Sequence, residues 1–179
     1  MAAYNRVINC DSYFNRDAED GNADGFAPKL SVGTGNYFYG CRAWNNSDDG
    51  WDGILYDAGE GFADDMTTIY ENCCAFKNGF LKDGSESKGN GNGFKLGGSG
   101  NNDRRHNALL IGCLAFDNLM KGFDQNHNTG DMMLINCTGF ANKYLKNKNH
   151  YTYRIDEEIL APGKALTLTN CVAVWDGIA

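Results

Sequence analysis

The segment ENCCAFKN at residues 71–78 is one of six related copies spread along the chain. In every copy Asn or Gly precedes a cysteine, a small residue usually lies two positions after it, and an aromatic residue or Val lies three positions after it. Asn lies five positions after the cysteine in all copies but the last, where Asp176 takes its place. The copies are INCDSYFN (8–15), YGCRAWNN (39–46), ENCCAFKN (71–78), IGCLAFDN (111–118), INCTGFAN (135–142) and TNCVAVWD (169–176).

Repeats of this kind predict a solenoid. Successive copies lie between 24 and 40 residues apart, contain short apolar strands and Gly or Asn turns, and show no helical periodicity. Alternation at period two points the cysteine and the small residue into a narrow coil. We therefore expect an all-β fold, a right-handed parallel β-helix that forms one domain over residues 1–179. Equivalent positions would stack into an internal column of cysteines and a hydrogen-bonded ladder of Asn15, Asn46, Asn78, Asn118 and Asn142.

Other interpretations of the repeats fit less well. Seven cysteines invite disulfides or a metal cluster, but their number is odd, no Cys-x-x-Cys pair occurs, and Cys73 and Cys74 are adjacent. A β-sandwich or propeller of short hairpins would need two-residue hairpin turns, which are missing. Because the repeats keep register over variable spacing, residues 80–92, rich in Gly, Ser, Asn and Lys, are expected to form a loop inserted at one corner of the coil.

A second recurring pattern, Gly followed by an aromatic residue, sets acidic residues in register. Its copies are NADGFA (22–27), SDDGWD (47–52), GNGFKLGG (91–98) and MKGFDQN (120–126). Alignment on the glycines gives one column of Asp24, Asp49, Asn92 and Lys121, and another of Ala27, Asp52, Lys95 and Asp124. The aromatic residues Trp51, Phe94 and Phe123 are expected in the core rather than as sugar platforms.

Stacking would gather the carboxylates of Asp24, Asp48, Asp49 and Asp52 from two adjacent coils. Four carboxylates repel one another unless a cation compensates. Calcium suits them because it accepts about six to eight oxygen ligands in flexible geometry, whereas magnesium prefers fewer carboxylates. A single Asp-Asp-Gly run is explained equally well as a turn. The Asp-Gly-Phe of the neighbouring coil and the additional Asp52 favour a metal site.

Lys95 follows Asp52 by one coil, so its amine is expected at the edge of this cluster. A lysine beside carboxylates is commonly a solvated ion-pair partner. A general base would need a neutral amine, which the carboxylates oppose and which a bound divalent cation and partial burial favour.

Charge and hydropathy exclude two classes of partner. The chain has 16 basic and 23 acidic residues and a formal net charge of −7, which argues against nucleic-acid binding. No segment has the roughly 18 successive apolar residues that a membrane span needs. If an acidic protein acts on a polyanion, the repulsion between their negative charges must be offset at the site, for example by a bound divalent metal.

The segments NADGFA, NSDDGWD, GFKLGG and AFDNLMKGFDQN together resemble polysaccharide lyase family 9, calcium-dependent pectate lyases with a right-handed parallel β-helix. The resemblance covers most of the chain, which is shorter than a complete member. It implies that the residues binding the catalytic calcium ion are Asp24, Asp48, Asp49 and Asp52. It also implies that Lys95 is the catalytic base, with Lys88 in the preceding loop as the alternative.

This resemblance implies a secreted bacterial enzyme that cleaves polygalacturonate by calcium-assisted β-elimination. Three alternatives stay open: hydrolysis by two carboxylates such as Asp48 and Asp49, a non-catalytic carbohydrate-binding solenoid stabilised by calcium, and a lyase for another uronic polymer such as rhamnogalacturonan. Further uronates could be bound by residues of the later coils, although each could equally be a surface residue: Lys121, Arg104, Arg105, Asn126 and His106. We expect a monomer, with end-to-end association if the coil ends are uncapped.

Overall fold

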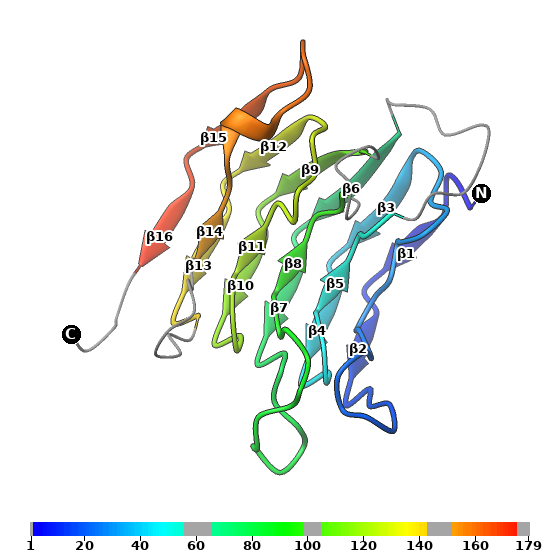
Figure 1. Cartoon of the computed structure of the whole chain (residues 1–179), viewed down its shortest axis with the longest axis vertical. Helices are drawn as coiled ribbons and strands as arrows, with labels where there is room; N and C mark the ends of the chain where they lie inside the picture. The colour runs from blue at the N-terminus through cyan, green and yellow to red at the C-terminus, as the bar shows by residue number, and fades with distance from the viewer. Residues whose placement is uncertain (1, 56–65, 99–104, 143–151, 175–179) are drawn as a thin grey trace.

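The computed structural model describes residues 2–55, 66–98, 105–142 and 152–174, and its strands form three parallel sheets (Figure 1). The first sheet contains β1 (Arg6–Ile8), β3 (Asn36–Tyr39), β6 (Thr67–Glu71), β9 (Asn107–Ile111), β12 (Met132–Ile135) and β15 (Leu166–Thr169). The second contains β2 (Asp11–Tyr13), β4 (Arg42–Trp44), β7 (Cys74–Phe76), β10 (Leu114–Phe116), β13 (Thr138–Phe140) and β16 (Val172–Val174). The third contains β5 (Trp51–Asp52), β8 (Phe94–Lys95), β11 (Phe123–Asp124) and β14 (Tyr153–Arg154).

Each strand pairs with its counterpart one coil away, so the chain passes through the sheets in turn and then repeats the circuit. This arrangement confirms the predicted all-β parallel coil. A single turn of 3-10 helix, η1 (Glu157–Ile159), follows β14. Among the described residues, no helix has the length and apolar character needed to cross a membrane.

The turn between the first and second sheets explains the residue before each cysteine. That residue has a positive φ in all six copies: Asn9, Gly40, Asn72, Gly112, Asn136 and Asn170. Gly adopts this left-handed conformation at no steric cost, and Asn is among the residues that tolerate it best. The chain then turns inward, and the Sγ atoms of Cys73 and Cys113 lie 3.5 and 3.4 Å from carbonyl oxygens of the preceding coil. All seven cysteines are free thiols. The predicted stack is confirmed in the core for Cys41, Cys73, Cys113 and Cys137, whereas Cys171 is partly buried and Cys10, in the first coil, is exposed.

The asparagine ladder is confirmed over five coils. The side-chain amide of Asn15 donates to Asn46 Oδ1 at 2.8 Å, and the same contact recurs at 2.9 Å from Asn46 to Asn78, from Asn78 to Asn118 and from Asn118 to Asn142. Asp176, at the equivalent position of the sixth copy, lies outside the described residues. Because Asn46, Asn78 and Asn118 are fully buried, the ladder satisfies polar groups that would otherwise destabilise the corner.

The glycine before each inward aromatic residue is required by close approach between coils. A Cβ atom on Gly25, Gly50 or Gly93 would lie 2.6 Å from the carbonyl oxygen of the column glycine in the next coil. The aromatic rings that follow stack face to face from coil to coil, with 4.6 Å between the centroids of Trp51 and Phe94. As predicted, Trp51, Phe94 and Phe123 are core residues with no exposed surface. The third sheet is therefore fixed in register by its buried face, and its other face carries the polar columns.

Candidate active site

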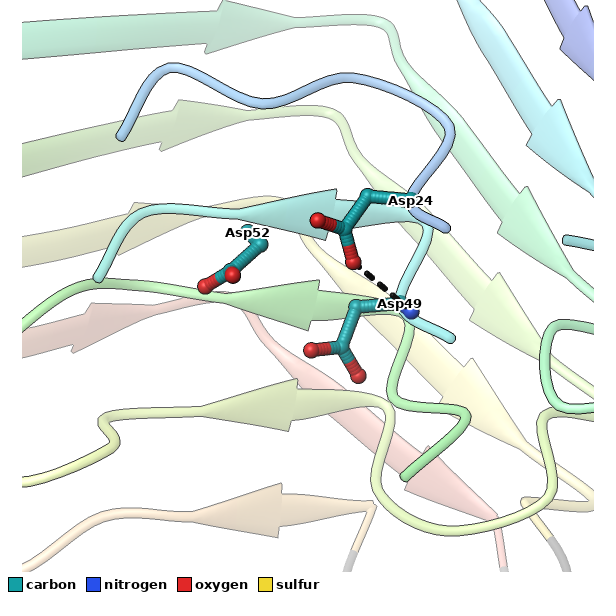
Figure 2. A group of neighbouring side chains, drawn as sticks. All are labelled: Asp24, Asp49 and Asp52. Carbon is teal, nitrogen blue, oxygen red and sulfur yellow. Dashed lines mark hydrogen bonds between the residues drawn. The ribbon is translucent and has the colours of Figure 1, made fainter. Parts of the chain in front are cut away.

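The first polar column uses one oxygen of each side chain to hold the coils together. Asp24 Oδ1 accepts a hydrogen bond from the backbone N–H of Asp49 at 3.1 Å (Figure 2). Asp49 Oδ1 accepts from both the backbone and the side-chain N–H of Asn92, each at 2.8 Å. The other oxygen of each carboxylate is thereby left to face the neighbouring column.

The second polar column lies on the third sheet in the predicted register. Asp52 on β5 pairs with Lys95 on β8, which in turn pairs with Asp124 on β11. Carboxylate oxygens of Asp24, Asp49 and Asp52 all lie within 4.8 Å of one another, and Figure 2 shows the three side chains gathered at one place. We call these three residues the carboxylate cluster. Carboxylate oxygens this close together can coordinate the same cation.

Lys95 is buried against this cluster, with 8% of its surface exposed. Its Nζ lies 3.0 Å from Asp49 Oδ2 and 3.5 Å from Asp52 Oδ1. Burial lowers the pKa of Lys95, but the Asp49 and Asp52 carboxylates outweigh burial and the net effect is a raised pKa. Without a further cation, the amine is held protonated.

Lys29, which sequence reasoning missed, supplies a second ammonium group. Its Nζ lies 2.5 Å from Asp24 Oδ2 and 2.9 Å from Asp52 Oδ2. Burial lowers the pKa of Lys29 and the hydrogen bonds to these two carboxylates raise it, with a net increase. Its sequence context gave no signal, because Lys29 lies beyond the Gly-aromatic pattern, after Pro28.

Asp48 is the one predicted metal ligand that the structure leaves outside the carboxylate cluster. Its Oδ1 accepts a hydrogen bond from the backbone N–H of Asn90 at 2.7 Å, which fastens residues 80–92, the segment between β7 and β8, to the coil below. Burial raises the pKa of Asp48, and the charge on Asp24 adds to this effect. Asp48 is thus close to the cluster but turned toward the loop, and its role as a fourth ligand stays a prediction.

The carboxylate cluster fits a hard divalent cation. Asp49 is fully buried, and apart from the Lys95 ammonium 3.0 Å away its Oδ2 has no hydrogen-bond partner. Burial raises the pKa of Asp49, the Lys95 ammonium opposes this, and the neighbouring carboxylates reinforce it. A buried carboxylate oxygen with so few partners is unfavourable, and a divalent cation bound there would stabilise it. Calcium fits this all-oxygen donor set.

Of the remaining predicted site residues, Lys121 and Asn126 contact the same carboxylate, that of Asp124. Lys121 Nζ pairs with Asp124 Oδ2 at 2.8 Å, one coil beyond Lys95, and Asn126 donates its backbone N–H to Asp124 Oδ1 at 3.1 Å.

His106 is fully buried, and burial lowers its pKa to about 4, so it is a neutral core residue rather than a uronate ligand. Lys88, the alternative base, is exposed. Arg105 is half-buried just before β9, and Arg104 lies outside the described residues.

Substituting Lys29 with methionine is expected to tighten calcium binding. The Lys29 ammonium occupies the outer oxygens of Asp24 and Asp52, so a metal ion must displace it. Removal of a charged hydrogen bond of this kind should raise the affinity by about tenfold, measured by titration calorimetry. Lys164→Met, which removes an ion pair with Asp131 elsewhere, is the matched control. Weaker binding by Lys29→Met would mean that Lys29 instead positions the carboxylates.

The three-sheet coil with a polar, carboxylate-bearing column on one sheet defines the class: a right-handed parallel β-helix protein with an acidic site. Residues 1–158 match the family model described as the Pel9A-like, right-handed β-helix region. The chain belongs to this family, in agreement with the predicted fold and with the resemblance found in its motifs.

Named relatives point to one group of polysaccharide-cleaving enzymes. Pectate lyase L of Dickeya dadantii (strain 3937) is 46% identical over 143 residues, which cover 78% of this chain and 31% of the relative. The crystal structure of pectate lyase Pel9A superposes with a TM-score of 0.71 at 38% identity, covering 98% of this chain and 42% of that one. A rhamnogalacturonan lyase structure gives a TM-score of 0.65 at 25% identity, covering 94% of this chain and 48% of that one. The chain therefore spans about a third of the length of the Dickeya relative.

Proposed function

We propose that this chain carries the catalytic centre of a pectate lyase that cleaves polygalacturonate by β-elimination. The observation that carries the proposal is the buried Lys95 amine, 3.0 Å from Asp49 Oδ2, beside three carboxylates that suit calcium. Identity of 46% to a pectate lyase supports the choice of substrate. Because such a polymer lies outside the cell, secretion is part of the proposal.

Asp24, Asp49 and Asp52 would hold the calcium ion, with Asp48 as the predicted fourth ligand. Bound there, calcium would offset the negative charge of a uronate carboxylate and make the neighbouring C5 hydrogen more acidic. Lys95, as the neutral amine, takes the C5 proton. The electron pair of the C5–H bond forms the C4–C5 double bond, the C4–O bond to the next sugar breaks, and the released oxygen takes a proton from solvent.

The protonation state of Lys95 couples the base to the cation. In the metal-free site the carboxylates hold its pKa above the ordinary value, which favours an ammonium group that cannot accept a proton. When a divalent cation offsets those carboxylates, burial becomes the dominant influence on Lys95 and favours the neutral amine. Calcium would thus be required for the base as well as for substrate binding.

Elimination accounts for the site better than hydrolysis does. A hydrolase places its two carboxyl groups on opposite sides of the scissile bond, at least about 5 Å apart, with one of them acting as an acid. Here the carboxylates share one small volume and two ammonium groups. A rhamnogalacturonan lyase is the second candidate, favoured by the likeness to a structure of that name.

The test is the appearance of unsaturated uronate absorbance when the protein is mixed with polygalacturonate. A rise that requires calcium and stops with chelator is the expected result. A rise with rhamnogalacturonan alone would select the second candidate. No rise with either polymer, while calcium still raises the melting temperature, would indicate a non-catalytic solenoid.

A further inference from the structure

The charge of the second polar column changes sign along the third sheet. Asp52 on β5 and Lys95 on β8 are followed by Asp124 on β11 and Arg154 on β14, which pair in register. Neighbouring coils lie about 4.8 Å apart, so Arg154 lies two coils, roughly 10 Å, beyond Lys95. The column therefore has an acidic end at the carboxylate cluster and a second charged group at its other end.

That second group, Lys121, Asp124 and Arg154, is termed the distal cluster. Lys121 Nζ lies 2.8 Å from Asp124 Oδ2, and Arg154 Nη1 lies 3.8 Å from Asp124 Oδ1. Asp124 Oδ1 is already taken by the backbone N–H of Asn126 at 3.1 Å. One buried carboxylate thus faces two cations, so the distal cluster has one surplus positive charge. Asp156, the nearest acidic residue after Arg154, caps η1 through the Glu158 N–H.

The two cationic side chains are partly exposed to solvent, whereas the carboxylate of Asp124 that holds them is buried. The side chain of Arg154 is 36% exposed and that of Lys121 is 16% exposed, whereas that of Asp124 is 2% exposed. Asp124 therefore holds the two cations in place, and its single negative charge does not neutralise both of them. A guanidinium group with free N–H donors suits a carboxylate, which it can bind through two parallel hydrogen bonds.

We infer that Lys121 and Arg154 form a metal-independent subsite for a second uronate carboxylate of the polymer bound at the carboxylate cluster. This inference rests on the proposed function, and it assigns the two ends of the second polar column different ways of binding the same chemical group. At the acidic end a carboxylate needs a bridging cation. At the distal cluster a carboxylate binds protein cations directly.

Trigalacturonate binding in the presence of chelator, measured by titration calorimetry at low salt, tests the inference. Wild-type protein is expected to bind, Arg154→Ala to bind about tenfold more weakly, and Lys121→Ala/Arg154→Ala to lose measurable binding. Arg154→Lys should recover part of the affinity, because it keeps the charge but not the paired donors. Raising the salt concentration should weaken wild-type binding.

Two controls separate this subsite from general charge effects. Arg42→Ala removes an exposed arginine on β4, in a different sheet, and should leave binding unchanged. Fully methyl-esterified trigalacturonate lacks the charge and should not bind. Absence of trigalacturonate binding by wild type in chelator, or equal binding by wild type and Arg154→Ala, would overturn the inference. Neither result depends on product formation, so failure of the proposed lyase activity would be seen separately.

Discussion

Lys95→Ala is expected to lower the rate of unsaturated-product formation by about 100- to 10,000-fold, the usual contribution of a general base. The amine is the proposed proton acceptor and lies at the edge of the carboxylate cluster, 3.0 Å from Asp49 Oδ2. Loss of a positive charge from that position should also tighten calcium binding, so kcat should fall without loss of the metal. Initial rates at saturating calcium and polymer, together with calorimetric calcium affinity, measure the two effects.

Two further variants identify the base. Lys95→Arg keeps a cation beside Asp49 and Asp52, but a guanidinium group does not deprotonate, so this variant should fold and remain inactive. Lys88→Ala removes the exposed alternative lysine and should retain wild-type kcat. Full activity in Lys95→Ala, or collapse of activity in Lys88→Ala, would move the base to the loop.

The fold could be predicted because its constraints are local and repeated. Each coil has a residue with positive φ before the cysteine, and the sequence places Asn or Gly there, as at Asn72 and Gly112. The corresponding position before the ladder asparagine is left-handed too, but only Asn45 and Asp117 suit that conformation, and Phe14, Lys77 and Ala141 occupy it in the other three coils. Packing enforces the conformation there against residue preference, so no pattern revealed it.

The site could be predicted in part, for the residues that the coil register fixes. Asp24, Asp49, Asp52 and Lys95 lie in columns beside the Gly-aromatic pattern, and register alone brings them together. The position of Asp48 depends on its hydrogen bond to the loop, which register does not determine.

Arg154 was missed because its coil departs from the pattern. Thr152 occurs where the other coils have glycine, and Tyr153 continues the aromatic stack onto Phe123. The motif that would have aligned Arg154 with Asp124 therefore lacks its glycine.

Asp49→Asn is expected to weaken calcium binding by on the order of 100-fold, because even changes outside the ligand shell often cost 10- to 100-fold. The substitution preserves shape: an amide oxygen can still accept the two hydrogen bonds that Asn92 donates to Asp49 Oδ1. What it removes is the charge on the buried Oδ2. Asp11→Asn, a change at a carboxylate paired with Arg42 on the second sheet, should leave calcium affinity unaltered.

The same variant should weaken the pH dependence of stability in chelator. Burial raises the pKa of folded Asp49 above its ordinary value of 3.8, so folded protein holds this proton more tightly than unfolded protein does. The resulting stability is present in acid and is lost as the pH rises from about 4 through the raised pKa. Wild type should therefore lose melting temperature over that range when calcium is absent, and Asp49→Asn should lose less. Calcium should restore wild type at neutral pH and have little effect on Asp49→Asn. If both proteins respond equally to calcium and to pH, then Asp49 does not bind the metal and the carboxylate cluster is held by its lysines alone.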